Sequence, residues 1–88
     1  MQAHIFYAGN VQGVGFRFTV ERLAKRIGLS GWVRNLSDGR VELMVEGEDG
    51  KVEDLQKVIE DAFDGSIKGK EINCHPKDGE FKDFNITY

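Results

Sequence analysis

Hydrophobic and polar residues alternate with a period of two in several parts of the chain, which predicts β-strands. The first of these segments has an apolar residue on both of its faces, because Phe6 lies on the face opposite Ile5 and Tyr7. This pattern favours a central strand of a sheet. The predicted strands are Ala3–Gly9, Leu29–Arg34, Arg40–Glu46, Ile67–His75 and Phe81–Tyr88.

Two other segments follow the helical period. In Phe16–Ile27 the apolar residues form one stripe, Glu21 and Lys25 have the spacing of an ion pair, and Gly28 occupies the position of a C-terminal cap. The second helix ends near Asp64–Ser66, and its apolar positions are Val52, Leu55, Ile59, Ala62 and Phe63.

The order of these elements predicts the fold. Asn35–Gly39 is a turn with the Asp-Gly signal of a hairpin, and residues 76–79 form a second turn. A strand–helix–strand–strand–helix–strand order with one extra short strand is typical of the α+β, ferredoxin-like (split βαβ) arrangement. We expect a single domain, residues 1–88, in which an antiparallel sheet carries both helices on one face. Three large aromatic residues should lie between the layers, namely Phe16, Trp32 and Phe63.

Composition narrows the possible functions. The 88 residues carry a net charge of −3, which does not favour binding to nucleic acid, although Arg17–Arg26 is locally basic. The single cysteine, Cys74, excludes an intrachain disulfide and a cysteine metal cluster. The first residues lack a signal-peptide pattern, and no apolar run approaches the ~20 residues that span a bilayer. We therefore expect a cytoplasmic protein without a membrane partner.

Candidate chemistry lies at the first strand-to-helix junction. A loop that opens a helix presents backbone N–H groups without helical partners, and the helix dipole adds positive potential there. Gly13 and Gly15 let the backbone curl around an anion, and Arg17 can donate to two oxygens of a tetrahedral oxyanion. The loop lacks the Gly-Lys-Ser/Thr ending of a Walker A sequence and the glycine spacing of a dinucleotide fingerprint.

An RNA-recognition motif is the main alternative suggested by the loop. Gly13–Phe18 has some likeness to the aromatic RNP1 segment of that module, which shares the predicted order of elements. In that module, however, the aromatic segment lies on the third strand, where bases stack. Here it follows the first strand, and Arg40–Glu46 carries no aromatic residue. We therefore expect no nucleic-acid partner.

Two long segments resemble the signatures of the acylphosphatase family. Gly9–Arg17 is similar to the first signature, and Gly31–Glu42, continuing to Gly47, is similar to the second. The resemblance extends over the whole chain in length and element order. Two positions depart from the family pattern, because Asn10 stands where a basic or small residue is common and Tyr7 where an aliphatic residue is usual.

The resemblance implies a function and a site. Such enzymes hydrolyse small acyl phosphates to a carboxylate and inorganic phosphate without a metal or other cofactor. By resemblance, Arg17 binds the phosphoryl group and Asn35 orients the attacking water. We expect a monomer in which inorganic phosphate or sulfate competes with the substrate. The phosphate-binding loop would consist of Val11, Gln12, Gly13, Val14, Gly15 and Phe16.

Simpler readings of the same residues remain open. Glycines at a strand-to-helix turn can serve chain geometry alone, and Asn35 on its own could be a turn residue because Asn tolerates turn geometry. A non-catalytic anion-binding or interaction domain of the same fold is the alternative function.

Overall fold

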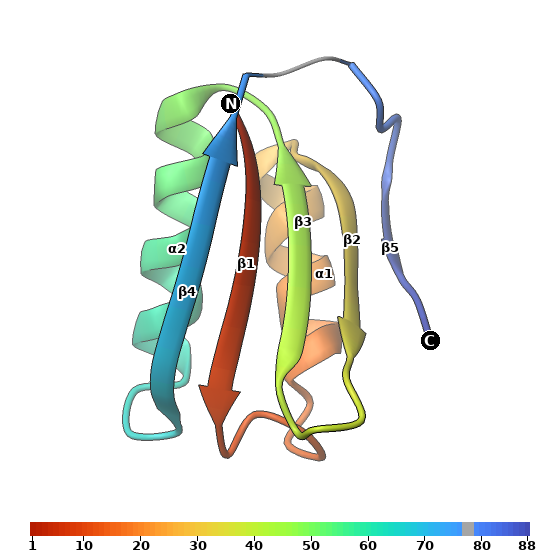
Figure 1. The fold of residues 1–88 in the computed structure, drawn as a ribbon. Helices are drawn as coiled ribbons and strands as arrows, with labels where there is room; N and C mark the ends of the chain where they lie inside the picture. The colour runs from red at the N-terminus through yellow and green to blue at the C-terminus, as the bar shows by residue number, and fades with distance from the viewer. Residues whose placement is uncertain (77–78) are drawn as a thin grey trace.

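The computed structural model describes residues 1–76 and 79–88, and it forms two layers. Both helices cover the same face of one five-stranded sheet with the strand order β4-β1-β3-β2-β5 (Figure 1). The predicted ferredoxin-like α+β class is therefore confirmed. The elements are β1 (Gln2–Gly9), α1 (Phe16–Ile27), β2 (Ser30–Asn35), β3 (Val41–Glu46), α2 (Asp49–Ala62), β4 (Ile67–His75) and β5 (Phe84–Ile86).

The strand pairing is antiparallel except at one edge. β1 lies between β3 and β4, as expected for a strand with apolar residues on both faces. The last strand is shorter than the predicted Phe81–Tyr88, and β5 runs parallel to β2, with Phe84 opposite Gly31. The sheet is therefore mixed. Of the predicted turn at 76–79, residues 77 and 78 lie outside the described part of the chain.

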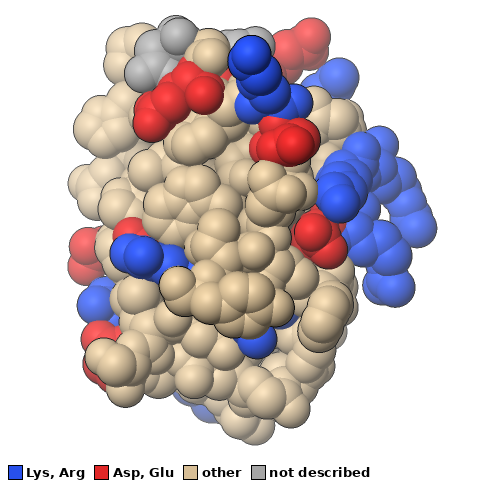
Figure 2. Space-filling model, turned by 90° about the vertical axis from the view of Figure 1, so that its right-hand side faces the viewer, with Lys and Arg blue, Asp and Glu red and all other residues tan. Residues whose placement is uncertain are grey.

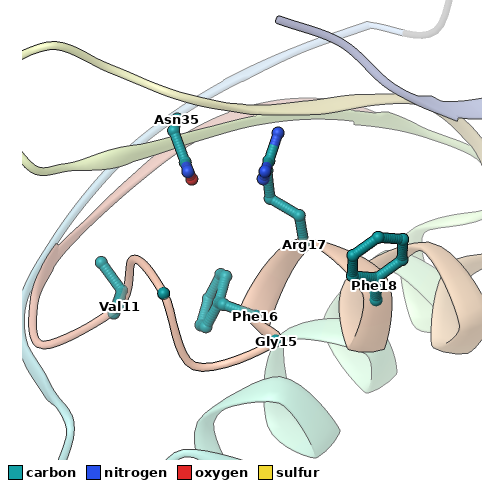
Figure 3. A pocket seen from close by; sticks show the side chains of 7 residues that line it. Val11, Gly15, Phe16, Arg17, Phe18 and Asn35 are labelled. Carbon is teal, nitrogen blue, oxygen red and sulfur yellow. The ribbon is translucent and has the colours of Figure 1, made fainter.

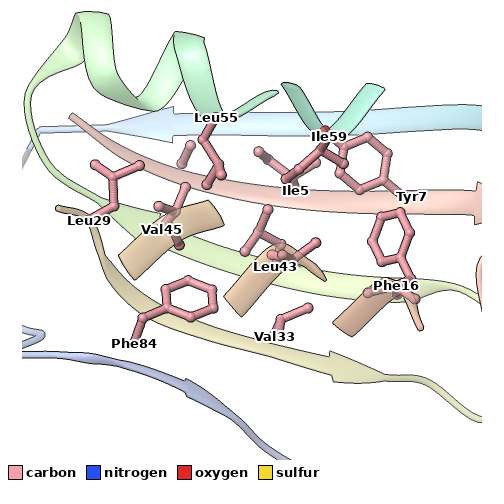
Figure 4. Packing of buried hydrophobic residues seen from close by; sticks show 14 of the residues in the cluster. Ile5, Tyr7, Phe16, Leu29, Val33, Leu43, Val45, Leu55, Ile59 and Phe84 are labelled. Carbon is pink, nitrogen blue, oxygen red and sulfur yellow. The ribbon is translucent and has the colours of Figure 1, made fainter. Parts of the chain in front are cut away.

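The hydrophobic core lies between the sheet and the two helices (Figure 4). β1 and β3 supply its centre, because Ile5 and Leu43 are fully buried, and α2 covers them with Leu55 and Ile59. Each fully buried side chain of this size stabilises the fold by about 1.5–3 kcal/mol through the hydrophobic effect. The predicted stripes on both helices therefore face the sheet, except that Ala62, at the end of α2, is exposed.

One of the three expected core aromatics lies elsewhere. Phe16 is 1% exposed and its ring centroid is 4.6 Å from that of Phe63, which packs at the margin of the core. The expectation for Trp32 is wrong, because it is on the sheet face without helices, where the guanidinium of Arg34 lies 5.2 Å from its ring. Val33, the next residue, is fully buried instead. Strand alternation allows only one of the two neighbours to face the core.

The turns that carry the candidate residues lie at one end of the molecule. The β1–α1 loop, the β2–β3 turn and the α2–β4 turn meet at the end where β1 finishes (Figure 1). The predicted cap at Gly28 is confirmed at the other end of α1, where its N–H donates to the carbonyl of Ala24. No helix in the described ranges is long and apolar enough to cross a bilayer.

Candidate active site

The β1–α1 loop takes its shape from glycines with positive φ. Gly13 has a φ of 76° and Gly15 a φ of 77°, values that other residues rarely adopt. A Cβ at either position would meet no atom within 4 Å, so it would project into open space rather than into the protein. The backbone of this loop is therefore accessible to a ligand, as an anion cradle requires.

Buried anchors hold the two ends of the loop in place. Val11 is fully buried, and Phe16 packs edge-on against Tyr7 at a centroid distance of 5.7 Å. The N–H of Asn10 donates to the carbonyl of Ser66 over 2.9 Å, which fastens the loop to the α2–β4 turn. These contacts fix the loop between the core and a neighbouring turn, and so preorganise its backbone.

Tyr7, one of the two departures from the family pattern, is fully buried and packs against Phe16 at the end of this loop. Its hydroxyl donates to Oε2 of Glu60 over 2.9 Å, and Lys70 contacts the same carboxylate at 2.7 Å. Burial of the ring, helped by the negative Glu60, raises the pKa of Tyr7 above its ordinary value. The phenol therefore remains neutral and extends the core beneath the loop with its polar atom satisfied.

The first turn of α1 follows the loop directly, and the first N–H groups of a helix have no partner within the helix. Gly15 is the N-cap residue, no side chain caps the helix, and no acidic residue lies in the first turn. Since the helix dipole is positive here, the potential favours an oxyanion. The anion site that the sequence predicts at this junction stays a prediction.

Arg17 extends from that first turn over the loop. Its guanidinium lies 5.0 Å from the ring centroid of Tyr88, a cation–π contact. Among the described residues no carboxylate forms an ion pair with Arg17. The positive charge therefore contacts an aromatic ring and is not neutralised by an acidic side chain among the described residues.

Asn35 reaches the same space from the sheet. It is the last residue of β2, opposite Val41, rather than the first residue of the turn as the sequence analysis expected. Figure 3 shows its side chain pointing toward the space that Arg17 enters from the other side. Its Oδ1 is buried and has no hydrogen-bond partner within the described residues. A buried acceptor of this kind usually has a partner, so its orientation calls for a donor in the site.

A cavity of about 140 Å³ joins these groups. Most of the predicted loop residues line it, but the side chains of Gln12 and Val14 do not, and Gln12 makes contacts elsewhere. Phe18, which the sequence analysis did not select, also lines the cavity and is 67% exposed. The sequence shows only that Phe18 lies beside Arg17 and off the apolar stripe of α1, which does not by itself place it at a cavity. The lining consists of Val11, Gly13, Gly15, Phe16, Arg17, Phe18 and Asn35.

Charge is unevenly distributed around this site. On the side of the molecule that carries β5, Lys and Arg side chains gather over the helical margin, while the middle is mostly uncharged (Figure 2). The exposed Arg22, Lys25 and Arg26 of α1 agree with this distribution. Most of the predicted basic segment thus lies on the outer face of α1, whereas Arg17 lines the cavity at its N-terminus. Within residues 1–76 and 79–88, no three His, Cys, Asp or Glu side chains gather as a metal-ligand group would.

Fold and site together define a class: a ferredoxin-like α+β domain with a small cavity where a glycine-rich loop opens its first helix. A family model described as acylphosphatase matches residues 3–86. The acylphosphatase of Roseiflexus sp. (strain RS-1) is 38% identical over 91 residues, covering 99% of this chain and 95% of that protein. The acylphosphatase of Pseudomonas paraeruginosa is 46% identical over 77 residues, covering 86% of this chain and 85% of that protein.

A solved structure agrees with these relatives. The crystal structure of the acylphosphatase from Bacillus subtilis has a TM-score of 0.91 and 32% identity to this chain, covering 99% of this chain and 98% of that one. The chain belongs to the acylphosphatase family.

Proposed function

We propose that this enzyme hydrolyses the carboxyl-phosphate bond of small acyl phosphates, with the phosphoryl group held by Arg17 and the loop amides and the attacking water held by Asn35. The observation that carries the proposal is that Asn35 lines the same cavity as Arg17 and the glycine-rich loop, while its buried Oδ1 has no hydrogen-bond partner among the described residues. A water molecule donating to Oδ1 would stand beside the bound phosphoryl group.

The chemistry needs few groups. The leaving group of an acyl phosphate is a weakly basic carboxylate, so no general acid is required to protonate it. Phosphoryl transfer depends mainly on positioning and on stabilising charge on the equatorial oxygens. Backbone N–H donors, the guanidinium of Arg17 and an amide that orients water supply both.

Benzoyl phosphate is a suitable test substrate because its hydrolysis changes the ultraviolet absorbance. We expect the purified protein to hydrolyse it and to release one phosphate per benzoate. Substituting Arg17 or Asn35 should slow the reaction, whereas the exposed Arg22 on the same helix serves as a control. A protein that binds phosphate in this cavity without hydrolysing the substrate would instead be the non-catalytic binding domain.

We further propose that the reaction proceeds without a divalent metal. The loop amides and Arg17 already provide positive partners for the phosphoryl oxygens, and the leaving group needs no Lewis acid. Excess EDTA should leave the rate of benzoyl phosphate hydrolysis unchanged. A large loss of rate that Mg²⁺ or Zn²⁺ restores would contradict this part of the proposal.

The proposal also covers the oligomeric state and the location of the protein. We propose a monomer, since the proposed site is built within one chain. We also propose that the protein is located in the cytoplasm. Analytical ultracentrifugation of the purified protein and fractionation of the source cells would test these two points.

A further inference from the structure

Gln12 lies in the middle of the phosphate-binding loop, yet its side chain does not line the cavity. Instead its Nε2 donates to the carbonyl of Leu36 over 2.7 Å and to the carbonyl of Arg40 over 3.0 Å. A primary amide has two N–H groups, so these two carbonyls occupy both of its donors. The side chain of Gln12 thus has no donor left for a phosphoryl oxygen.

Both acceptors belong to the β2–β3 turn that begins directly after Asn35. The turn has its own closing bonds, from the N–H of Leu36 to the carbonyl of Arg40 and from the N–H of Gly39 to the carbonyl of Leu36. Gln12 adds a connection to this turn from the β1–α1 loop. In the chain it is 24 positions from Leu36 and 28 positions from Arg40.

We infer that Gln12 is a positioning residue, whose side-chain amide fastens the phosphate-binding loop to the hairpin that carries Asn35. This inference rests on the proposed function. The loop and Arg17 would hold the phosphoryl group and Asn35 the water, so the distance between phosphorus and water depends on how firmly the two segments are joined. Gln12 makes side-chain hydrogen bonds from the loop to that hairpin. One of the two acceptors belongs to Leu36, the residue that directly follows Asn35.

Loss of this connection should affect turnover more than binding. Gln12→Met keeps the length of the side chain and removes both donors, while Val11, Gly13, Gly15 and Arg17 remain to bind phosphate. A displacement of about 1 Å between reacting groups can lower a rate by roughly 10²-fold. We therefore expect kcat for benzoyl phosphate to fall about 10- to 100-fold, with the inhibition constant for inorganic phosphate changing less than about 3-fold.

A matched control is available within the chain. Gln56 Nε2 donates to the carbonyl of Val52 over 3.3 Å on α2, so Gln56→Met also removes a bond from a side-chain amide to a carbonyl. This variant should leave kcat and phosphate inhibition unchanged. Gln12→Asn provides a second test, because it retains the amide but is too short by one methylene to reach both carbonyls, and it should resemble Gln12→Met.

A double-mutant cycle separates positioning from a general structural effect. If Gln12 acts through the hairpin of Asn35, then Gln12→Met should lower kcat much less in an Asn35→Ala background than in the native protein. Amide hydrogen exchange gives a readout that does not need activity, since the N–H groups of Leu36 and Gly39 should exchange faster in Gln12→Met and not in Gln56→Met.

Each outcome decides the inference. An unchanged kcat in Gln12→Met, with or without a large rise in the phosphate inhibition constant, would overturn the inference. An equal loss of kcat in the native and Asn35→Ala backgrounds would also overturn it. Neither result would contradict the proposed function. If Asn35→Ala itself retained full turnover, the proposed role of Asn35 would fail and this inference with it. Faster exchange at Leu36 and Gly39 together with a kcat loss that depends on Asn35 would support it.

Discussion

Arg17 combines a positive charge with a planar fork of N–H donors, and both properties matter for a tetrahedral oxyanion. Arg17→Lys keeps the charge but loses the fork. We expect both turnover and phosphate affinity to fall by at least ~10²-fold, the scale seen when a preorganised oxyanion donor is removed. The measurement is kcat for benzoyl phosphate together with the inhibition constant for phosphate.

Arg22→Lys is the control for this substitution, because Arg22 is exposed on the same helix. It should leave both constants unchanged. If Arg17→Lys retained most of the activity, charge alone would be sufficient at this position and the bidentate geometry would not be used.

Asn35 should affect chemistry and not binding. In Asn35→Ala the cradle of loop amides and Arg17 is intact, so phosphate inhibition should change little while kcat falls by roughly 10²–10³-fold. Because Oδ1 has no partner among the described residues, its removal should change the free energy of unfolding by about 1 kcal/mol or less. Kinetics and urea unfolding of one variant measure all three quantities.

Asn73→Ala, at an exposed position of β4, is the matched control and should have native kinetics. A collapse of phosphate inhibition together with kcat in Asn35→Ala would mean that Asn35 belongs to the phosphate cradle. Native turnover would mean that another group holds the water.

At the scale of residues, the sequence could predict which groups line the cavity where their position depends on local backbone. Gly15 and Arg17 are examples, because a loop that opens a helix determines where their N–H groups point. The roles of Gln12 and Phe18 could not be predicted in this way. Gln12 donates to a hairpin 24 or more positions away, and Phe18 lines the cavity only because the helix meets the sheet at this end. Both depend on tertiary contacts.

At the scale of elements, a cluster on the open face of the sheet links its three central strands. Glu42 on β3 accepts a hydrogen bond from Nε of Arg34 on β2, and its other oxygen lies 2.6 Å from Nε2 of His4 on β1. The Glu42 side chain is only 9% exposed. Burial raises the pKa of this carboxyl, but the bonds with His4 and Arg34 outweigh burial, so the pKa of Glu42 lies below its ordinary value.

This cluster makes stability depend on pH. Since the folded pKa of Glu42 is lowered, its contribution is present above the unfolded pKa of about 4.3 and is lost as pH falls through the folded pKa. Glu42→Gln should therefore lower the free energy of unfolding by about 1–3 kcal/mol at pH 7. The difference from the native protein should shrink below pH 4, as urea unfolding at both pH values would measure.

Asp38→Asn is a useful comparison. The pKa of Asp38 is also lowered, by its backbone and side-chain bonds with Arg40, but its side chain is 53% exposed, so solvent screens the interaction. This variant should change stability far less than Glu42→Gln. An equal effect of the two substitutions would show that burial of Glu42 does not strengthen its ion pairs.

The elements themselves were largely predictable, and two of the errors have clear physical causes. Alternation placed the strands, but it cannot distinguish parallel from antiparallel pairing, which is why the direction of β5 was missed. Trp32 was expected in the core because of its size. Ser30 and Arg34, two positions away on either side, share its face and are polar, whereas Val33 shares the other face with Gly31. That local pattern is a better guide to the buried face than side-chain size.

At the scale of the whole molecule, the site is a product of topology. β1 and β3 are neighbours, so the loop after β1 and the turn before β3 meet at one end of the sheet (Figure 1). Arg17 and Asn35 are far apart in sequence but line one cavity of about 140 Å³. A ligand in this cavity therefore contacts α1, the loop and β2 together, and it can stabilise the folded state as a unit.

Binding of phosphate should consequently raise the melting temperature of the whole protein. A ligand that binds only the folded state adds about 2.7 kcal/mol of stability at 100 times its Kd. For a domain of this size that free energy corresponds to a shift of roughly 10–20 °C. We expect phosphate and sulfate to produce such a shift by calorimetry, with Kd taken from competitive inhibition, and chloride at the same ionic strength to produce almost none. Arg17→Ala should abolish the shift whereas Arg22→Ala should retain it, and equal shifts in the two variants would place the bound anion on the basic outer face of α1 instead of in the cavity.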